Sequence, residues 1–237
     1  MNRKKKKKSR NFLFIILSIM IVGLIVKLKD NGLINNKENS AHASTKNRNK
    51  RNTSSEKILT GKTIVLDAGH GGKDIGASGQ RGAIEKDLTL TMAKNIQNEL
   101  MNRTGANVIL TRDDDVKISL TDRVNIAEES NADLFLSIHF DAFFTKEVEG
   151  ITSYYNKKSD EPLAALILDY IFKNGLDARD RGVSLGDYYV LRENSRPSIL
   201  LELGYISNST DEARMTSDEF QTNTTNSIVA GIIDYLK

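Results

Sequence analysis

The stretch SILLELG, residues 198–204, is apolar throughout apart from Ser198 and one glutamate, Glu202. A short apolar run of this kind predicts a strand that is buried inside a sheet. An ionised carboxylate is costly to bury unless a partner compensates its charge. The stretch therefore predicts an inner strand and raises the question of what Glu202 does there.

Strand-like and helix-like patterns alternate along the chain from Lys62 onward. Apolar and β-branched runs predict strands at residues 62–67, 107–110, 134–138, 151–155, 188–191 and 198–203. Helical spacing of apolar residues predicts helices at residues 88–101, 120–127, 163–172 and 228–236. Gly105 follows the first of these helices and is expected to end it. The alternation predicts an α/β fold, with one sheet and helices on its faces.

Three ionisable side chains stand where expected strands end. His70 follows the run KTIVLDAG, His139 follows LFLSI, and Glu202 ends SILL. Ligands of open α/β sheets bind beyond the carboxyl ends of the strands. We therefore expect these three side chains to lie near one another at one edge of the sheet.

The residue types at these positions suit a metal site. The chain has three histidines and no cysteine, and His42 lies in the N-terminal region, so His70 and His139 are the two candidates. A catalytic zinc commonly takes three nitrogen or oxygen ligands and a water, so the third ligand would be an Asp or a Glu. Glu85 is a candidate for it, and an acid that complements a helix N-terminus is the alternative interpretation of that residue. A hydrogen-bonded structural role is the alternative for each histidine alone.

An uncharged apolar run near the N-terminus predicts a membrane anchor. Residues 12–26 read FLFIILSIMIVGLIV and follow a basic tail, residues 1–11. Fifteen helical residues span about 22 Å of a hydrocarbon core that is about 30 Å thick, and Leu28 can extend the run. We expect an uncleaved single-pass anchor over residues 12–28, with the remainder of the chain outside the cell membrane. A signal peptide cut before Ser44, which would release a secreted protein, is the alternative.

The next segment, residues 29–57, is rich in Asn, Ser, Lys and Thr and is expected to be a flexible basic linker. Residues 58–237, the expected catalytic domain, hold 19 basic and 28 acidic side chains and carry a net charge of −9. The sequence pI near 8.9 therefore arises from the first 57 residues. It gives no argument for nucleic-acid binding, and we expect no nucleic-acid partner.

Four separated motifs give the sequence a specific resemblance. They are IVLDAGHGGKDIGA (64–77), GAIEKDLTL (82–90), LFLSIHFDA (134–142) and PSILLELGYISN (197–208). In order and spacing they resemble the zinc-dependent N-acetylmuramoyl-L-alanine amidases of the amidase-3 family, from about Lys62 to the C-terminus. The resemblance implies an open, twisted, mixed β-sheet flanked by helices. It also implies one zinc ion with His70, Glu85 and His139 as ligands, and Glu202 as the catalytic glutamate.

The reaction implied by the resemblance cleaves the amide between N-acetylmuramic acid and L-alanine in peptidoglycan, which is then the expected partner. Two alternatives stay open: a zinc peptidase that acts on peptidoglycan stem peptides, and an amidase that needs a membrane-protein regulator. A non-catalytic wall-binding module is disfavoured, because all four site residues are present. The third motif has Asp141 where the family commonly has Asn, which leaves the role of that residue open. Other substrate-binding residues are not assigned.

Two further side chains have competing interpretations. Asp67 would either orient an imidazole that binds the metal or cap the glycine-rich loop. Arg192 would either contact a carboxylate of the substrate or lie on the surface.

Overall fold

The computed structural model describes residues 57–237. The expected basic tail, the expected anchor and all of the expected linker except Lys57 lie outside the described residues. Within residues 57–237, no helix has the length and apolar character needed to cross a membrane.

Six strands form one mixed sheet in the order β2-β1-β3-β6-β4-β5. Strands β2, β1, β3 and β6 are parallel to one another, whereas β4 runs antiparallel to β6, and β5 runs parallel to β4. All eight residues of β6 are buried, which confirms the inner strand expected from SILLELG. The bounds are β1 (Thr63–Ala68), β2 (Asn107–Leu110), β3 (Leu134–Asp141), β4 (Ile151–Tyr155), β5 (Asp180–Leu185) and β6 (Ser198–Tyr205).

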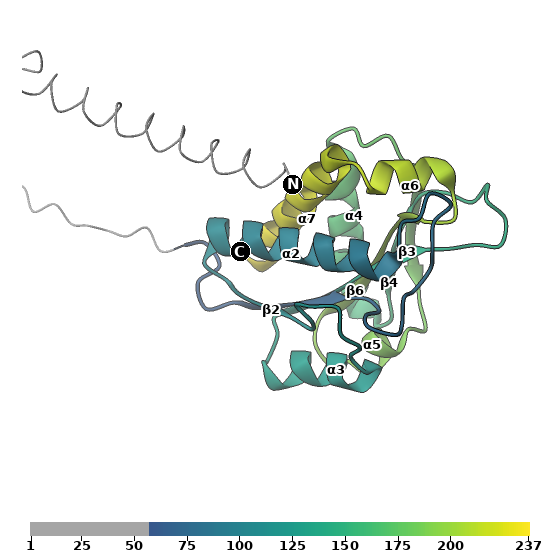
Figure 1. The fold of residues 1–237 in the computed structure, drawn as a ribbon. Coiled ribbons are helices and arrows are strands. Elements are labelled where there is room, and N and C mark those ends of the chain that lie inside the picture. Colours follow the sequence, from purple (N-terminus) through teal and green to yellow (C-terminus); the bar gives the residue numbers. More distant parts are fainter. Residues whose placement is uncertain (1–56) are drawn as a thin grey trace, which may run out of the picture. The chain divides into compact units, whose positions relative to one another are not determined.

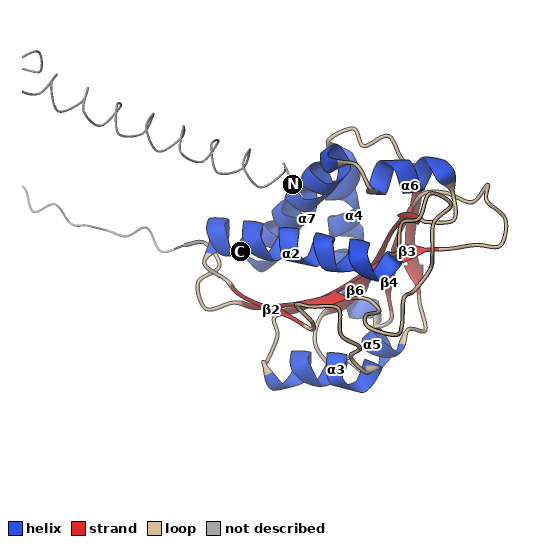
Figure 2. Ribbon diagram, viewed as in Figure 1, coloured by secondary structure: helices blue, strands red, loops and turns tan. Residues whose placement is uncertain are grey.

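Helices cover the two faces of this sheet unequally (Figures 1 and 2). One face carries three long helices, α2 (Glu85–Thr104), α4 (Glu161–Lys173) and α7 (Asp218–Leu236). The other face carries α3 (Leu120–Glu129) and the single turn α5 (Tyr189–Arg192). A short 3₁₀ turn, η1 (Lys158–Asp160), precedes α4, and α6 (Ser209–Met215) follows β6.

Alternate residues of each strand supply two separate cores. In β6, Ile199 and Leu201 belong to the large core under α2, α4 and α7, whereas Leu200 belongs to a smaller core near α3 and α5. This is the period of two that a strand imposes on its side chains. Because α3 and α5 are short, the carboxyl ends of β1, β3 and β6 on their face border a cavity instead of a packed helix.

Local signals explain several element ends. Gly105 ends α2 in a left-handed conformation, with φ 73°, as the sequence predicts. The Ser119 and Ser217 side chains cap α3 and α7 by accepting hydrogen bonds from the backbone N–H groups of Asp122 and Phe220.

The strand expected at residues 188–191 is wrong, because this segment forms the helical turn α5. Tyr188 is extended and precedes the turn, and Val190 and Leu191 are both buried in or beside the smaller core. Two consecutive buried residues suit a turn, and tertiary packing here overrides the strand preference of Tyr and Val. The sequence patterns also missed β5 and α6, and α7 begins at Asp218, ahead of the apolar repeat that predicted it.

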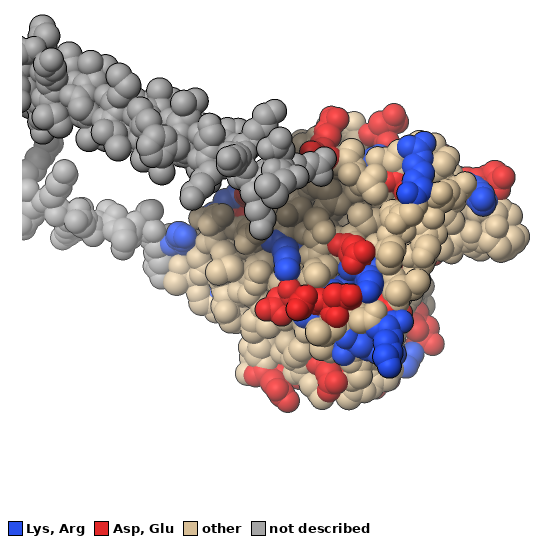
Figure 3. Space-filling model, in the orientation of Figure 1, with Lys and Arg blue, Asp and Glu red and all other residues tan. Residues whose placement is uncertain are grey.

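The surface of the described residues mixes charges of both signs. On the face drawn in Figure 3, acidic and basic side chains are interspersed over the domain. Some form ion pairs, such as Lys86 Nζ with Asp115 Oδ2 at 2.6 Å and Lys62 Nζ with Asp133 Oδ1 at 3.1 Å.

A buried ion pair lies at the end of β1. Asp67 Oδ1 accepts a hydrogen bond from Arg123 Nη1 at 2.5 Å, and the Thr111 and Ser137 hydroxyls each donate to Asp67 at 2.7 Å. Burial alone would raise the pKa of Asp67, but Arg123 and the two hydroxyls hold it below the usual value of 3.8. Since the pKa is lower in the folded state, this stabilisation is present at neutral pH and is lost as the pH falls through the lowered pKa.

Asp67→Asn is expected to reduce the free energy of unfolding by roughly 3–5 kcal/mol, because it leaves the Arg123 charge buried without a partner. Denaturant unfolding at pH 7 measures this change. The same substitution at Asp113, which is exposed, is the matched control and should change stability by no more than about 0.5 kcal/mol. Equal stability of the two variants would contradict the role given to the ion pair.

Candidate metal centre and active site

Three residues from distant segments converge on one point. His70 Nε2 lies 3.0 Å from Glu85 Oε1, and His139 Nδ1 lies 2.9 Å from the same oxygen. His70 follows β1, Glu85 is the first residue of α2, and His139 lies in β3. Their ligand atoms lie within 4.8 Å of one another, and no other group of three or more His, Cys, Asp or Glu residues in the described part of the chain is arranged in this way. The structure thus brings together the three predicted ligands.

The carboxylate of Glu85 is held in place from both sides. Its Oε2 accepts a hydrogen bond from the backbone N–H of Ala77 at 2.8 Å, and its Oε1 accepts one from that of Phe140 at 3.2 Å. Burial alone would raise the pKa of Glu85, but its contacts with His139 and His70 hold the pKa well below the usual 4.5. Glu85 is therefore an anionic oxygen donor in a rigid position.

His70 is oriented by a neighbouring acid, Asp74. Asp74 Oδ1 lies 2.9 Å from His70 Nδ1. A carboxylate that accepts the Nδ1 proton leaves the Nε2 lone pair free to bind a metal. Burial would lower the pKa of His70, but Glu85 and Asp74 raise it above its usual 6.5. Asp74 is not among the predicted site residues, although an acid four residues after a histidine in the same loop is a usable signal in the sequence.

Two positions of the glycine-rich loop have no room for a side chain. A Cβ atom on Gly69 would lie 2.3 Å from Cε1 of the His139 ring, and one on Gly76 would lie 2.5 Å from Glu85 Oε2. Glycine at these positions lets the loop backbone lie directly against the His139 and Glu85 side chains. His70 itself has φ 60°, an uncommon backbone conformation for a residue other than glycine.

Two buried arginines hold the backbone of this loop. Arg112 donates from Nε to the Ala68 carbonyl and from Nη2 to the Gly69 carbonyl, each at 2.9 Å. Arg123 donates from Nη1 to the Ala68 carbonyl and from Nη2 to the His70 carbonyl, each at 2.7 Å. Three successive carbonyl groups are thereby satisfied, which stabilises the unusual conformation of His70.

Glu202 lies beside the cluster of His70, Glu85 and His139. It pairs with His139 across β3 and β6, is 7% exposed, and lines a cavity of about 170 Å³ together with both histidines. Burial raises its pKa well above 4.5, and the charges of Asp141 and Glu85 raise it further. The expected convergence of the three strand-end residues is therefore confirmed.

Comparison with known proteins agrees with this geometry. The sequence model of the N-acetylmuramoyl-L-alanine amidase family matches residues 64–234. The chain belongs to this amidase family. The resemblance seen in the four motifs is thus confirmed.

Relatives and solved structures of amidases match most of the chain. The probable cell wall amidase LytH of Staphylococcus aureus is 41% identical over 186 residues, which cover 78% of this chain and 62% of LytH. The catalytic domain of the amidase CwlV from Bacillus (Paenibacillus) polymyxa is 37% identical with a TM-score of 0.71, over 74% of this chain and 98% of that domain. The CwlD amidase from Clostridioides difficile, solved in complex with the GerS lipoprotein, is 33% identical with a TM-score of 0.66, over 74% and 98% of the two chains.

Two other residues of the amidase domain can now be placed. Asp67 forms no hydrogen bond with either imidazole. It pairs instead with Arg123, which donates to the His70 carbonyl, so Asp67 supports the loop through that arginine. Arg192 is exposed and is bound to Asp187 and Glu193, which matches the surface interpretation.

Asp141 is the last residue of β3. Its Oδ1 accepts a hydrogen bond from the backbone N–H of Ala142 at 2.7 Å. Burial and the Asp141 charge together raise the pKa of Tyr205 to about 12. The Asp141 charge also raises the pKa of Glu202, so Asp141 adds negative charge close to that carboxyl group.

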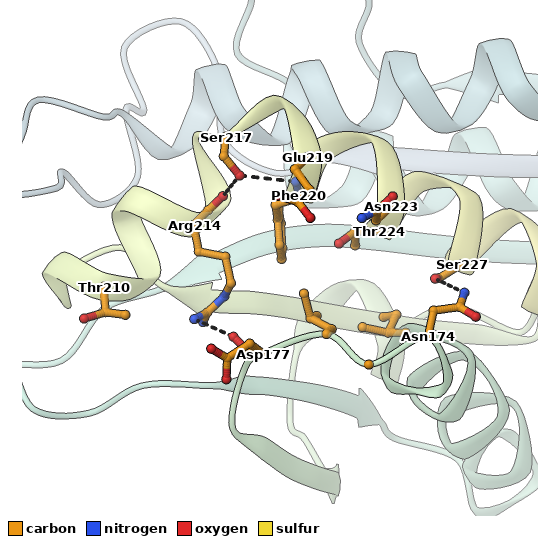
Figure 4. A pocket seen from close by; sticks show the side chains of 13 residues that line it. Asn174, Asp177, Thr210, Arg214, Ser217, Glu219, Phe220, Asn223, Thr224 and Ser227 are labelled. Carbon is orange, nitrogen blue, oxygen red and sulfur yellow. Dashed lines mark hydrogen bonds between the residues drawn. The ribbon is translucent and has the colours of Figure 1, made fainter.

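A larger cavity of about 400 Å³ lies elsewhere, between α4, α6 and α7 (Figure 4). No histidine lines it, and Arg214 in its wall donates to the Asp177 carbonyl at 3.2 Å. This cavity is the larger of the two, but the residues that could bind a metal ion, among those that the structure describes, lie at the smaller one.

Asp74→Asn is expected to weaken zinc binding by roughly 10- to 100-fold, the usual cost of altering a partner of a metal-binding imidazole. Competition with a chromophoric chelator measures the affinity. Asp113→Asn is again the control, since it makes the same chemical change at an exposed position, and should bind zinc as the wild type does. An Asp74→Asn protein with wild-type affinity would refute the orienting role of this carboxylate.

Proposed function

We propose that this protein is a zinc-dependent amidase that cleaves the bond between N-acetylmuramic acid and L-alanine in peptidoglycan. The observation that carries the proposal is the cluster of His70, Glu85 and His139, whose two histidines line the same cavity as Glu202. Membership of the amidase family supports it, as does the similarity to the probable cell wall amidase LytH and to the amidase CwlV.

The donor set fits zinc. Two imidazole nitrogens and one carboxylate oxygen converge, without cysteine, which is the ligand chemistry of catalytic zinc sites. His70, Glu85 and His139 would hold the ion, and Asp74 would keep His70 in the tautomer that binds. When bound, zinc supplies Lewis acidity and lowers the pKa of a water to about 7.

Glu202 carries the proton transfers in this proposal. Its carboxylate accepts a proton from the attacking water and returns it to the departing nitrogen of L-alanine. Burial raises the pKa of Glu202 above its usual value, which suits a carboxyl group that both accepts and donates a proton in general acid–base catalysis. Glu85 has the opposite shift and stays ionised, so the two glutamates have separate roles.

The zinc peptidase is the second candidate, since the metal cluster alone suits either substrate bond. Digestion of purified peptidoglycan, read by mass spectrometry with and without chelator, separates the two. Free stem peptide that begins with L-alanine supports the amidase, whereas cleavage inside the stem supports the peptidase. Activity that survives the chelator would contradict both.

Glu202→Gln is expected to lower the rate of stem-peptide release by about 10²- to 10⁴-fold, because the amide cannot accept the proton. Bound zinc, measured by elemental analysis, and the thermal unfolding midpoint should stay close to the wild-type values. Undiminished cleavage by this variant would remove Glu202 from the mechanism.

We further propose that residues 12–28 anchor the protein in the cell membrane, between a cytoplasmic tail of residues 1–11 and an outer linker of residues 29–57. The sequence pattern supports this arrangement, as does an outer domain, residues 58–237, that would act on a cell-wall polymer. The complex of CwlD with a lipoprotein supports a membrane-associated partner here as well.

The full-length protein is therefore expected in the membrane fraction, resistant to extraction by high salt and released by detergent. Its N-terminus should be that of the translated chain. N-terminal sequencing that begins at Ser44 would contradict the anchor and favour secretion.

A further inference from the structure

We infer that Thr152 is a positioning residue for Glu202, and that its hydroxyl donates a hydrogen bond to Glu202 Oε2. This inference rests on the proposed function and adds to it a side chain outside the four family motifs. Thr152 lies in β4, the strand that runs antiparallel to β6.

The sheet register places the two side chains together. Thr152 is the direct partner of Glu202 between β4 and β6, and His139 is its partner between β3 and β6. Directly paired residues point to the same face of a sheet, and in an antiparallel pair their Cβ atoms lie about 4.5–5.5 Å apart. Glu202 is thus flanked by a metal ligand on one side and by a hydroxyl on the other.

Both groups are buried and lack a partner. Thr152 is 3% exposed, and neither its Oγ1 nor Glu202 Oε2 has a hydrogen bond within the described residues. One atom is a donor and the other an acceptor, so a single hydrogen bond satisfies both. From paired Cβ positions, rotation about the side-chain bonds of either residue brings the hydroxyl within reach of the carboxylate.

The neighbouring groups on the same face have other contacts. His139 Nδ1 lies against Glu85, and the ring of Tyr154, two residues along β4, packs against Tyr188 at 5.0 Å between centroids.

The sheet is also irregular on both sides of the Thr152–Glu202 pair, with register shifts after His139 in β3 and after Ile151 in β4. Such irregularities often redirect side chains beside active sites.

A hydrogen bond to Oε2 would fix the orientation of the Glu202 carboxylate. Glu202 lines the cavity, and its Oε2 has almost no accessible surface, so Oε2 is the shielded oxygen of the carboxylate. An anchor at Oε2 stops the carboxylate from turning and leaves the other oxygen to face the substrate. Thr152 would therefore affect the chemical step more than substrate binding.

The test compares three variants of the full-length protein in detergent, with released stem peptide as the readout. Thr152→Val keeps the side-chain shape and removes the hydroxyl; we expect kcat to fall by about 10-fold or more with KM unchanged. Thr152→Ser keeps the hydroxyl and should retain nearly wild-type kcat. Ser153→Ala is the matched control, because this hydroxyl is also buried and unpartnered but lies on the opposite face of the sheet, and its kcat should not change.

Zinc content and thermal unfolding are measured for each variant, and Thr152→Ala replaces Thr152→Val if the latter does not fold. A purely structural hydroxyl predicts a different result: Thr152→Val would be as stable as the wild type or more so, with unchanged kcat, and that result would overturn the inference. An equal loss of kcat in Thr152→Ser would also overturn it. A wild-type protein that releases no stem peptide would instead contradict the proposed function and, with it, this role.

Discussion

The site depends on the buried contact between Asp67 and Arg123 at the end of β1. The loop after β1 carries His70 at φ 60°, and its backbone carbonyl groups need hydrogen-bond partners. Arg123 and Arg112 supply those hydrogen bonds from their guanidinium groups, and Asp67 neutralises the first of them. Without these contacts, His70 would have neither a fixed backbone nor a fixed distance to Glu85.

The unequal covering of the sheet then determines where chemistry can take place. Three long helices pack against one face, while the opposite face is closed only near α3 and α5. Side chains at the carboxyl ends of β1, β3 and β6 on that face therefore border a cavity. Strand β4 pairs with β6 in the antiparallel direction, and this pairing places Thr152 directly opposite Glu202.

Two glutamates in this small region have opposite electrostatic environments. Glu85 has two imidazoles and two backbone N–H groups around it, which stabilise its anionic form. Glu202 is buried and has the negatively charged neighbours Asp141 and Glu85, which favour its protonated form. This difference in environment is consistent with the separate roles proposed for the two glutamates.

Most of the strands and the main candidate site residues could be predicted from the sequence alone. Apolar runs predicted five of the six strands, and the residue types at their ends identified His70, His139 and Glu202, because strand period and residue chemistry are local properties. Tertiary structure alone decided that residues 189–192 form a turn, that Arg112 and Arg123 support the loop, and that Thr152 faces Glu202. These depend on the order and direction of strands that are far apart in the chain, and on which buried polar groups meet there. No local pattern encodes the partner of a buried group, since burial itself arises only when the sheet is assembled.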